Sequence, residues 1–336
     1  PTILPPGMLG DLCGMLRAFR PLAPDLSFSV EIDPTEVDAA RLEVLARAGM
    51  TRASIGVQDF DAALQDQSGR VHSFDLTREV AAMIRGAGVA SLNMDLLYGL
   101  PHQTRARMMD TVQKVLALVP DRVALYGYAH VPWMAKRQVM IPADALPGAE
   151  ERLDLFEAAA RMFHWDGYEE IGIDHFAREA DPLAVAAREG RLRRGFQGYG
   201  EDGCDVLIGL GASAISRYPQ GYAQNAPTSS AYAQAVRAGR LATERGHAMS
   251  AEDALRADLI EGLMCRFAID LPAVAARHGR PLAEVEAVVA PLRRRFEGWV
   301  AQEGGRLRIA RAPRLIARLA AQALDAYAMP EGRHSR

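Results

Sequence analysis

The stretch LSFSVEIDPTEVDAARLEVLARAGMTRASIGVQ, residues 26–58, reads as a strand, a helix and a second strand. Residues 26–33 and 52–58 read as buried strands. In the helix between them Asp33 is a possible cap, Pro34 suits the first helical position and Gly49 ends the helix. Two strands joined by a helix of this length pair in parallel through a right-handed crossover. The stretch therefore predicts a βαβ unit in an α/β fold.

The same alternation continues on both sides of this unit. A helix is expected over 4–19, before the first strand. Further strands are expected over 91–99, 122–131 and 168–177, and further helices over 75–88, with Asp75 as a possible cap, 104–120 and 149–167. This order predicts a parallel sheet that curls into a barrel or forms an open doubly wound sheet.

The pattern changes twice toward the carboxyl end. After about residue 178 it becomes irregular and rich in Gly, Arg and aromatic residues, and from about residue 250 it turns helical. A hairpin is expected around Gly304–Gly305, and helices with one small hairpin suggest a winged-helix-like domain. We therefore expect a barrel over 1–178, a covering segment over 179–245 and a C-terminal helical domain over 246–336.

Composition narrows the class of protein. The 336 residues are 49% hydrophobic and 24% charged, with a net charge of −3, which gives no reason to expect nucleic acid or an anionic membrane as a partner. No apolar run is long enough to span a bilayer and no signal peptide opens the chain, so we expect a cytoplasmic protein. Cys13, Cys204 and Cys265 are far apart, which argues against disulfides and against a zinc site.

Polar residues stand near the carboxyl ends of four successive expected strands: Glu31, Gln58, Asn93 with Asp95, and Tyr128 with His130. In parallel α/β proteins this edge of the sheet carries the active site. A buried polar side chain costs free energy unless it is paired. Each residue taken alone could bond a neighbouring loop, but the set predicts one shared polar ligand. Arg70 lies in the loop after Gln58 and could reach a carboxylate of the ligand. The alternative is that its side chain is simply solvated.

Seven motifs together resemble one family. They occur in this order: SFSVEIDP, ASIGVQDF, NMDLLYGLPHQT, YGYAHVPWM, IGIDHFAR, RLRRGFQGYG and GLGASAIS followed by YAQN. The set resembles the oxygen-independent coproporphyrinogen III oxidases, radical S-adenosylmethionine (SAM) enzymes of haem biosynthesis, from Pro1 to about residue 330. The resemblance implies a partial (β/α)6 barrel, here without its N-terminal strands, and a C-terminal helical domain of winged-helix type.

The resemblance also implies a set of ligand contacts. Two SAM molecules would bind per chain. Glu31 and Ile215 would contact the first, whereas the second would be contacted by Gln58, Arg70, Asp95 and Ala129. The residue types suit SAM, since carboxylates accept from hydroxyl and ammonium groups and an arginine pairs with a carboxylate. No catalytic residue is identified by the resemblance.

The implied reaction is the oxidative decarboxylation of two propionates of coproporphyrinogen III to vinyl groups, giving protoporphyrinogen IX. A [4Fe–4S] cluster in the full-length protein cleaves SAM to a 5′-deoxyadenosyl radical. An electron donor for the cluster, a terminal electron acceptor and a monomeric state are expected. The substrate carries four carboxylates. A candidate basic patch for them, with a solvated surface as the alternative, is formed by Arg188, Arg191, Arg193 and Arg194.

The chain departs from the family pattern in three places. The cluster motif CxxxCxxC is absent, and the chain begins at the final PT of the family's GGGTPT segment, so no residue here is expected to bind the cluster. We expect a fragment lacking roughly the first quarter of the protein, with two barrel strands, that is inactive as given. A catalytically dead copy is the alternative. Gly195 and Gly200 replace the family's usual Asn and Thr.

Three rival functions are weaker. A related haem chaperone would lack the DHFAR and FQGYG motifs that this chain has, and it ranks second. An enzyme acting on a phosphorylated substrate would need a glycine-rich loop at a helix start, for which GLGAS (209–213) is the candidate. A DNA-binding winged helix would need more than the short basic run LRRRF (292–296).

Overall fold

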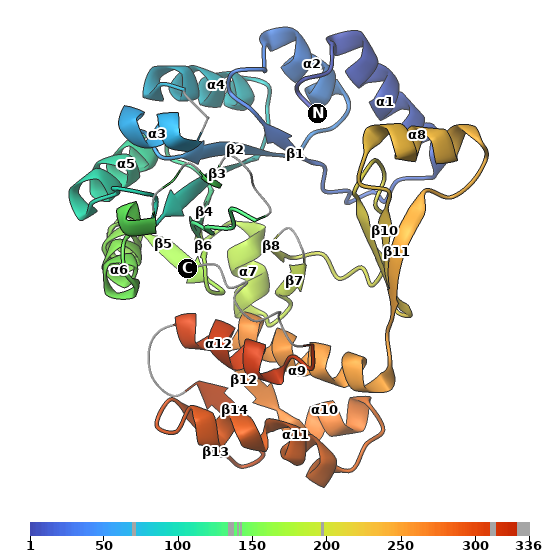
Figure 1. Ribbon diagram of the computed structural model, residues 1–336. Coiled ribbons are helices and arrows are strands. Elements are labelled where there is room, and N and C mark those ends of the chain that lie inside the picture. The colour runs from blue at the N-terminus through green and yellow to red at the C-terminus, as the bar shows by residue number, and fades with distance from the viewer. Residues whose placement is uncertain are drawn as a thin grey trace. The chain divides into compact units, whose positions relative to one another are not determined.

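The computed structural model describes residues 1–68, 72–133, 138–139, 141, 143–195, 198–309 and 314–327 (Figure 1). The chain forms two compact units that meet in sequence at Val185 and Ala186. The division into three segments expected from the sequence remains a prediction. No helix among the described residues combines the length and the apolar character needed to cross a bilayer.

The first unit is built on a six-stranded sheet in the order β1-β2-β3-β4-β6-β5. The strands are β1 Ser29–Ile32, β2 Arg52–Gln58, β3 Ser91–Tyr98, β4 Arg122–Gly127, β5 Tyr168–Ile171 and β6 His175–Arg178. Helices α2, α4, α5 and α6 lie along the outer side of the strand row (Figure 1). The helices of this part of the chain are α1 Pro6–Phe19, α2 Ala39–Arg47, α3 Ala62–Ser68, α4 Phe74–Gly86, α5 Arg105–Ala117, α6 Ala149–Trp165 and α7 Pro182–Arg188.

Strands β1 to β4 are parallel, as the βαβ pattern predicts. The expected strand over 168–177 is wrong, because Gly172 takes a φ of 57° and turns the chain. The segment forms a hairpin in which β6 pairs antiparallel with both β4 and β5. The sheet is therefore mixed.

Two helix starts differ from the expected ones. Helix α2 begins at Ala39, where Asp38 accepts a hydrogen bond from the Arg41 amide at 2.8 Å. The Asp33 carboxylate instead accepts from the Thr35 amide at 2.9 Å and forms a local turn. In α4 the cap is Ser73 and Asp75 lies in the first turn. The N-cap is the residue whose side chain accepts a hydrogen bond from a backbone amide of the first helical turn. The residue types alone do not show which of several candidates does so.

The core of the first unit lies between the sheet and its helices. Alternate side chains of β1 to β4 face the helices, and Val30, Ile55, Met94 and Leu125 are all buried there. The period of two along a strand sends the intervening residues to the opposite face. Burial of one face thus fixes which residues can form a site on the other.

The second unit holds three small sheets. A hairpin joins β7 Arg193–Gly195 to β8 Gly198–Gly200, and a second sheet has the order β11-β10-β9. The bounds of that sheet and its helix are β9 Ile215–Tyr218, β10 Gly221–Asn225, α8 Ser229–Arg237 and β11 Thr243–Ala248. The sequence pattern did not predict these strands, because they are only three to six residues long and lie in an irregular segment rich in Gly, Arg and aromatic residues.

The carboxyl-terminal part of this unit has the winged-helix-like arrangement that the sequence predicts. A sheet in the order β12-β14-β13 packs with helices around one apolar core. The hairpin turns at Gly304 and Gly305, both with positive φ. The elements are α9 Ala251–Arg266, β12 Ala268–Asp270, α10 Leu271–Arg277, α11 Leu282–Arg295, β13 Val300–Glu303, β14 Arg306–Ile309 and α12 Leu315–Leu324.

Candidate functional site

The face of the sheet that points away from the helices carries polar side chains on three adjacent strands. In register, Glu31 of β1 lies beside Ser54 of β2, and Ser54 lies beside Asn93 of β3. Asp95 follows two residues after Asn93 and so occupies the same face. The strand period therefore places Glu31, Ser54, Asn93 and Asp95 on one surface.

Hydrogen bonds fix the position of the Asp95 carboxylate. Asn93 donates from Nδ2 to Oδ1 of Asp95 at 2.8 Å and to Oγ of Ser54 at 3.0 Å. Ser54 in turn donates to Oδ2 of Asp95 at 3.2 Å. The Oδ1 atom of Asn93 is buried and has no hydrogen-bond partner among the described residues. An ordered carboxylate beside an unsatisfied acceptor is the arrangement of a site built for a ligand with donor groups.

A cavity of about 690 Å³ opens over this face. Its lining includes Glu31 and Asp95, together with Gly56 of β2 and His72 of the loop before α4. Asp33 and Glu36 add two more carboxylates to the lining. The volume lies within the range of small-molecule sites, and the carboxylates favour a ligand that carries positive charge.

Gln58 stands at an irregularity of β2. Its backbone has a φ of 64°, and the pairing with β3 shifts register between Gly56 and Gln58. Gln58 is half-buried and is not among the residues that line the cavity. A bulge at the end of a strand redirects the side chain at that position, so Gln58 does not continue the alternation of β2.

The next residue, Asp59, anchors the strand end. Its side chain is 1% exposed and accepts hydrogen bonds from Thr111 and from Gln103, each at 2.7 Å. Burial raises the pKa of this carboxyl, although the hydrogen bonds from Asp61, Thr111 and Gln103 oppose the shift. Asp59 thus ties β2 to the segment around α5 and has a structural role.

The loop after β4 brings two buried polar atoms to the carboxyl edge of the sheet. Tyr128 Oη and His130 Nδ1 are buried without hydrogen-bond partners in the described part of the chain, and their ring centroids lie 6.3 Å apart. Burial also raises the pKa of Tyr128. Ala129 between them is exposed, and its carbonyl accepts from Gln138 at 3.1 Å. Two unsatisfied polar atoms in one loop point to a bound group that supplies their partners.

Sequence reasoning missed several polar residues of this unit. Ser54 has a direct role in holding Asp95, and His72 lines the cavity. Tyr126 Oη lies 3.5 Å from Nε2 of His175, whose Nδ1 lies 2.7 Å from Asp174. Ser54 could have been found from the sequence, because it lies two residues before Gly56 and so on the same face of β2. The contact of Tyr126 with His175 could not, because it depends on the β5–β6 hairpin, which the sequence did not predict.

Ile215 belongs to the second unit, at the start of β9. A Cβ atom on Gly209 would lie 2.7 Å from the Ile215 carbonyl oxygen, so only glycine permits this close approach. The amide of Gly209 donates to Ser216 Oγ, and that of Gly211 donates to Tyr232 Oη. The GLGAS loop also leads into a strand. The hypothesis of a phosphate-binding loop is therefore wrong.

Of the other predicted residues, Arg70 lies outside the described part of the chain, and its contact stays a prediction. The cysteines do not fit an iron–sulfur cluster. Cys13 is buried on α1 and Cys204 is exposed, while burial raises the pKa of Cys265 to about 12. Within the described residues, no three His, Cys, Asp or Glu side chains are grouped so that they could hold a metal ion.

Two protein families match parts of the sequence. The radical SAM superfamily matches residues 6–115, which contain the strands of the polar face up to β3. The HemN C-terminal domain matches residues 249–316, which form most of the winged-helix-like part.

Related proteins match nearly the whole chain. The oxygen-independent coproporphyrinogen III oxidase of Paracoccus denitrificans is 52% identical over 100% of this chain and 74% of its own length. That of Pseudomonas aeruginosa is 36% identical over 97% of this chain and 72% of its own length. The solved structure of the coproporphyrinogen III oxidase HemN from Escherichia coli, a radical SAM enzyme, superposes with a TM-score of 0.91 at 34% identity and covers 98% of this chain and 76% of that one. The chain belongs to the oxygen-independent coproporphyrinogen III oxidase family of radical SAM enzymes.

Proposed function

We propose that this protein works in haem biosynthesis as an oxygen-independent coproporphyrinogen III oxidase. In this reaction two propionate side chains of coproporphyrinogen III become vinyl groups and protoporphyrinogen IX forms. Each propionate gives up a hydrogen atom, carbon dioxide and one electron. The family membership supports the reaction, and the ordered polar face of the first unit is the observation that carries the role of this chain.

The residues of the polar face fit SAM. Its ammonium and sulfonium groups carry positive charge, and its ribose carries hydroxyl donors. Glu31 and Asp95 line the cavity and offer carboxylates to such donors. The unsatisfied Oδ1 of Asn93 accepts a further donor. When bound, SAM supplies a 5′-deoxyadenosyl radical that removes the hydrogen atom.

The finer assignments belong to this proposal. Two SAM molecules bind per chain, one contacted by Glu31 and Ile215 and the other by Gln58, Arg70, Asp95 and Ala129. The fact that Glu31 and Asp95 line a single cavity supports a site in which two bound molecules lie close together. A cytoplasmic location, a monomeric state, an electron donor and a terminal electron acceptor complete the proposal.

Equilibrium dialysis with radiolabelled SAM tests the site. Glu31→Gln removes a charge from the exposed face of the cavity and should weaken SAM binding about tenfold to a hundredfold, which is the size of a hydrogen bond to a charged group. Glu157→Gln is the matched control, because Glu157 lies on α6, away from the lining of the cavity, and forms a surface pair with Arg161 at 3.5 Å. Equal SAM affinity of Glu31→Gln and Glu157→Gln would contradict the proposed role of Glu31.

A further inference from the structure

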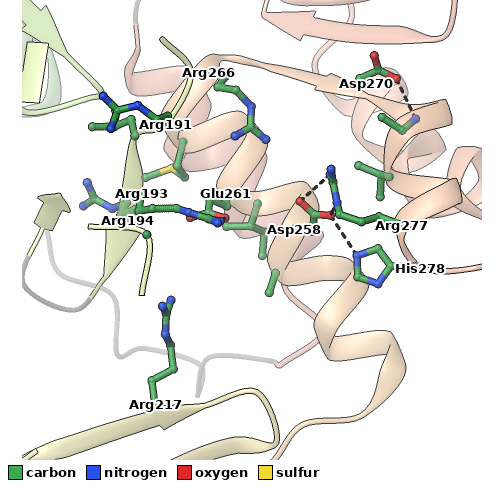
Figure 2. Close-up of a pocket in the computed structure, with 18 of the residues that line it drawn as sticks. Arg191, Arg193, Arg194, Arg217, Asp258, Glu261, Arg266, Asp270, Arg277 and His278 are labelled. Carbon is green, nitrogen blue, oxygen red and sulfur yellow. Dashed lines mark hydrogen bonds and ion pairs between the residues drawn. The ribbon is translucent and has the colours of Figure 1, made fainter. Parts of the chain in front are cut away.

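The second unit contains a large pocket that the proposed contacts with SAM do not use. Its volume is about 1100 Å³, and all the residues that line it lie between Gly190 and His278 (Figure 2). The pocket is lined by residues of the segment 190–192, of strands β7 and β9, and of helices α9 and α10. Segments far apart in the sequence therefore meet around one hollow, so the pocket is a product of the fold.

Arginine dominates the lining. Among the described residues six arginines and four acidic residues line the pocket. The arginines are Arg191, Arg193, Arg194, Arg217, Arg266 and Arg277. The sequence predicted a basic patch of Arg188, Arg191, Arg193 and Arg194. Three of these line the pocket, Arg188 is not among its lining residues, and the fold adds three other arginines. Guanidinium groups pair with carboxylates in a planar, two-pronged geometry.

Most of the acidic residues are already engaged. Asp258 pairs with Arg277 at 2.9 Å and lies 3.1 Å from Nε2 of His278. Glu261 accepts from Arg193 at 2.9 Å. Asp270 caps α10 by accepting from the Ala273 amide at 2.9 Å. These contacts leave the arginines in excess, because each of these carboxylates serves a local partner.

Two arginines form no ion pair in the described part of the chain, although Arg217 interacts at longer range with Asp202. Arg217 of β9 donates to the backbone carbonyl of Cys204 at 3.0 Å, and Arg266 is exposed at the end of α9. Figure 2 shows both side chains pointing toward the middle of the pocket from opposite sides. Like charges held around one hollow repel one another, and a bound anion removes that cost.

The pocket also has an apolar part. Ile260, Met264 and Val274 line it beside the arginines, and Tyr222 adds an aromatic ring. A ligand that combines a flat apolar body with several carboxylates matches this lining better than a small inorganic anion. Coproporphyrinogen III is such a molecule, since its tetrapyrrole ring carries four propionates, and the volume is large enough for a macrocycle.

We propose that this pocket binds the propionate side chains of the porphyrinogen substrate, with Arg217 and Arg266 as carboxylate ligands. This inference rests on the proposed function. It also gives a basis for specificity. The product keeps two of the four carboxylates and so forms fewer charge-assisted hydrogen bonds in the pocket than the substrate does. Loss of carboxylates during the reaction thereby favours release.

Fluorescence titration of the whole chain with two porphyrins tests the inference. Coproporphyrin III carries four propionates, whereas mesoporphyrin IX has ethyl groups in place of two of them. The wild-type chain should bind coproporphyrin III more tightly. The double variant Arg217→Gln/Arg266→Gln should bind it about a hundredfold more weakly, at about tenfold for each charged hydrogen bond lost, and should lose the preference over mesoporphyrin IX.

Two further variants separate binding from folding. Arg237→Gln removes an exposed arginine of α8 that does not line the pocket, and it should bind coproporphyrin III like the wild type. Ala273→Trp keeps every arginine and fills the pocket from an exposed position on α10, so it should weaken binding as well. The melting temperature of each variant shows whether it is folded.

The outcomes distinguish this inference from the proposed function. If the folded double variant or Ala273→Trp binds coproporphyrin III like the wild type, the pocket is not the substrate site, and the proposed function stands. If the wild-type chain shows no preference for coproporphyrin III over mesoporphyrin IX, carboxylate recognition here is wrong. If the wild-type chain binds neither porphyrin, while SAM binding is intact, the error lies in the substrate that the proposed function assigns.

Discussion

The cavity of the first unit and the pocket of the second differ in charge and in construction. Carboxylates line the cavity, and Asp95 is held there by side chains of neighbouring strands. Arginines line the pocket, and Arg217 and Arg266 come from elements distant in sequence. The first arrangement suits a cationic ligand and the second an anionic one.

The difference in construction matters for what a mutation does. Buried polar groups of the first unit, such as Ser54, belong to a sheet that packs against helices, so changing them disturbs folding and binding together. The pocket arginines are more exposed, so their removal should affect binding with little loss of stability. Comparing a residue of the first unit with one of the second, or with a matched control in the same unit, therefore tests this difference.

The largest effect is expected from a buried ion pair of the first unit. Arg122 Nε lies 2.5 Å from Oδ1 of Asp181, and the two side chains are 4% and 2% exposed. Arg122→Ala leaves Asp181 buried without its charge partner and should lower the free energy of unfolding by about 3–5 kcal/mol. The pair Arg193–Glu261 of the second unit is more exposed, at 49% and 20%. Arg193→Ala should therefore cost less than about 1 kcal/mol.

Urea denaturation of both variants measures this contrast. The loss in free energy of unfolding should be at least a few-fold larger for Arg122→Ala than for Arg193→Ala. If Arg122→Ala and Arg193→Ala lower the free energy of unfolding equally, the ion pair of the first unit is no more important for stability than the exposed pair of the second.

A smaller effect is expected where two backbones touch in the second unit. A side chain at Gly209 would place Cβ 2.7 Å from the backbone oxygen and 2.8 Å from the carbonyl carbon of Ile215, and backbone atoms cannot swing aside. Gly209→Ala should lower the free energy of unfolding by about 1–3 kcal/mol, as overpacking does. It should also displace the backbone of Ile215, and with it the contact to SAM that is proposed for this residue.

Gly203→Ala is the matched control, because a Cβ atom there meets nothing within 4 Å. This change should leave stability unchanged or raise it slightly by restricting the unfolded chain. A Gly209→Ala protein as stable as Gly203→Ala, in the same thermal melt, would show that the approach of the two backbones is not tight.

The sequence predicted the regular part of the first unit well. The expected strand 52–58 coincides with β2, and the expected strand 91–99 is β3 with one residue more. Strong alternation of strands and helices explains this success, since each buried strand is bounded by a helix. The prediction that Glu31 and Asp95 stand at one polar surface follows from the same regularity, and both line the cavity.

The rest depended on information that local pattern does not carry. Gly172 could be a bulge or a turn, and only the pairing of β6 with β4 decides between them. The pocket of the second unit could not be foreseen from the run 188–194, because Arg217 and Arg266 reach it through tertiary packing. Side chains that meet across distant elements show no spacing in the sequence.

The smallest effects are expected from two aspartates whose surroundings shift their pKa values in opposite directions. Asp59 of the first unit is buried, which raises its pKa from the ordinary 3.8. Asp253 of the second unit stands in the capping box of α9. Hydrogen bonds from the amide and hydroxyl of Ser250, at 2.8 and 2.7 Å, and from Tyr327 Oη, at 2.8 Å, lower its pKa to about 2.

The two shifts predict opposite dependences of stability on pH. A raised pKa stabilises the folded state below pH 3.8, and this contribution is lost as the pH rises through the folded pKa of Asp59. A lowered pKa stabilises the folded state above pH 3.8, and this contribution is lost as the pH falls toward about 2 for Asp253.

The stability of the wild type minus that of Asp59→Asn should therefore decrease with rising pH, whereas for Asp253→Asn the same difference should increase between about pH 2 and 4. Urea midpoints at a series of pH values measure both differences. Slopes of the same sign would mean that the carboxylate in the buried network of Asp59 is stabilised by its donors more than it is destabilised by burial, and the first unit would then titrate like the second.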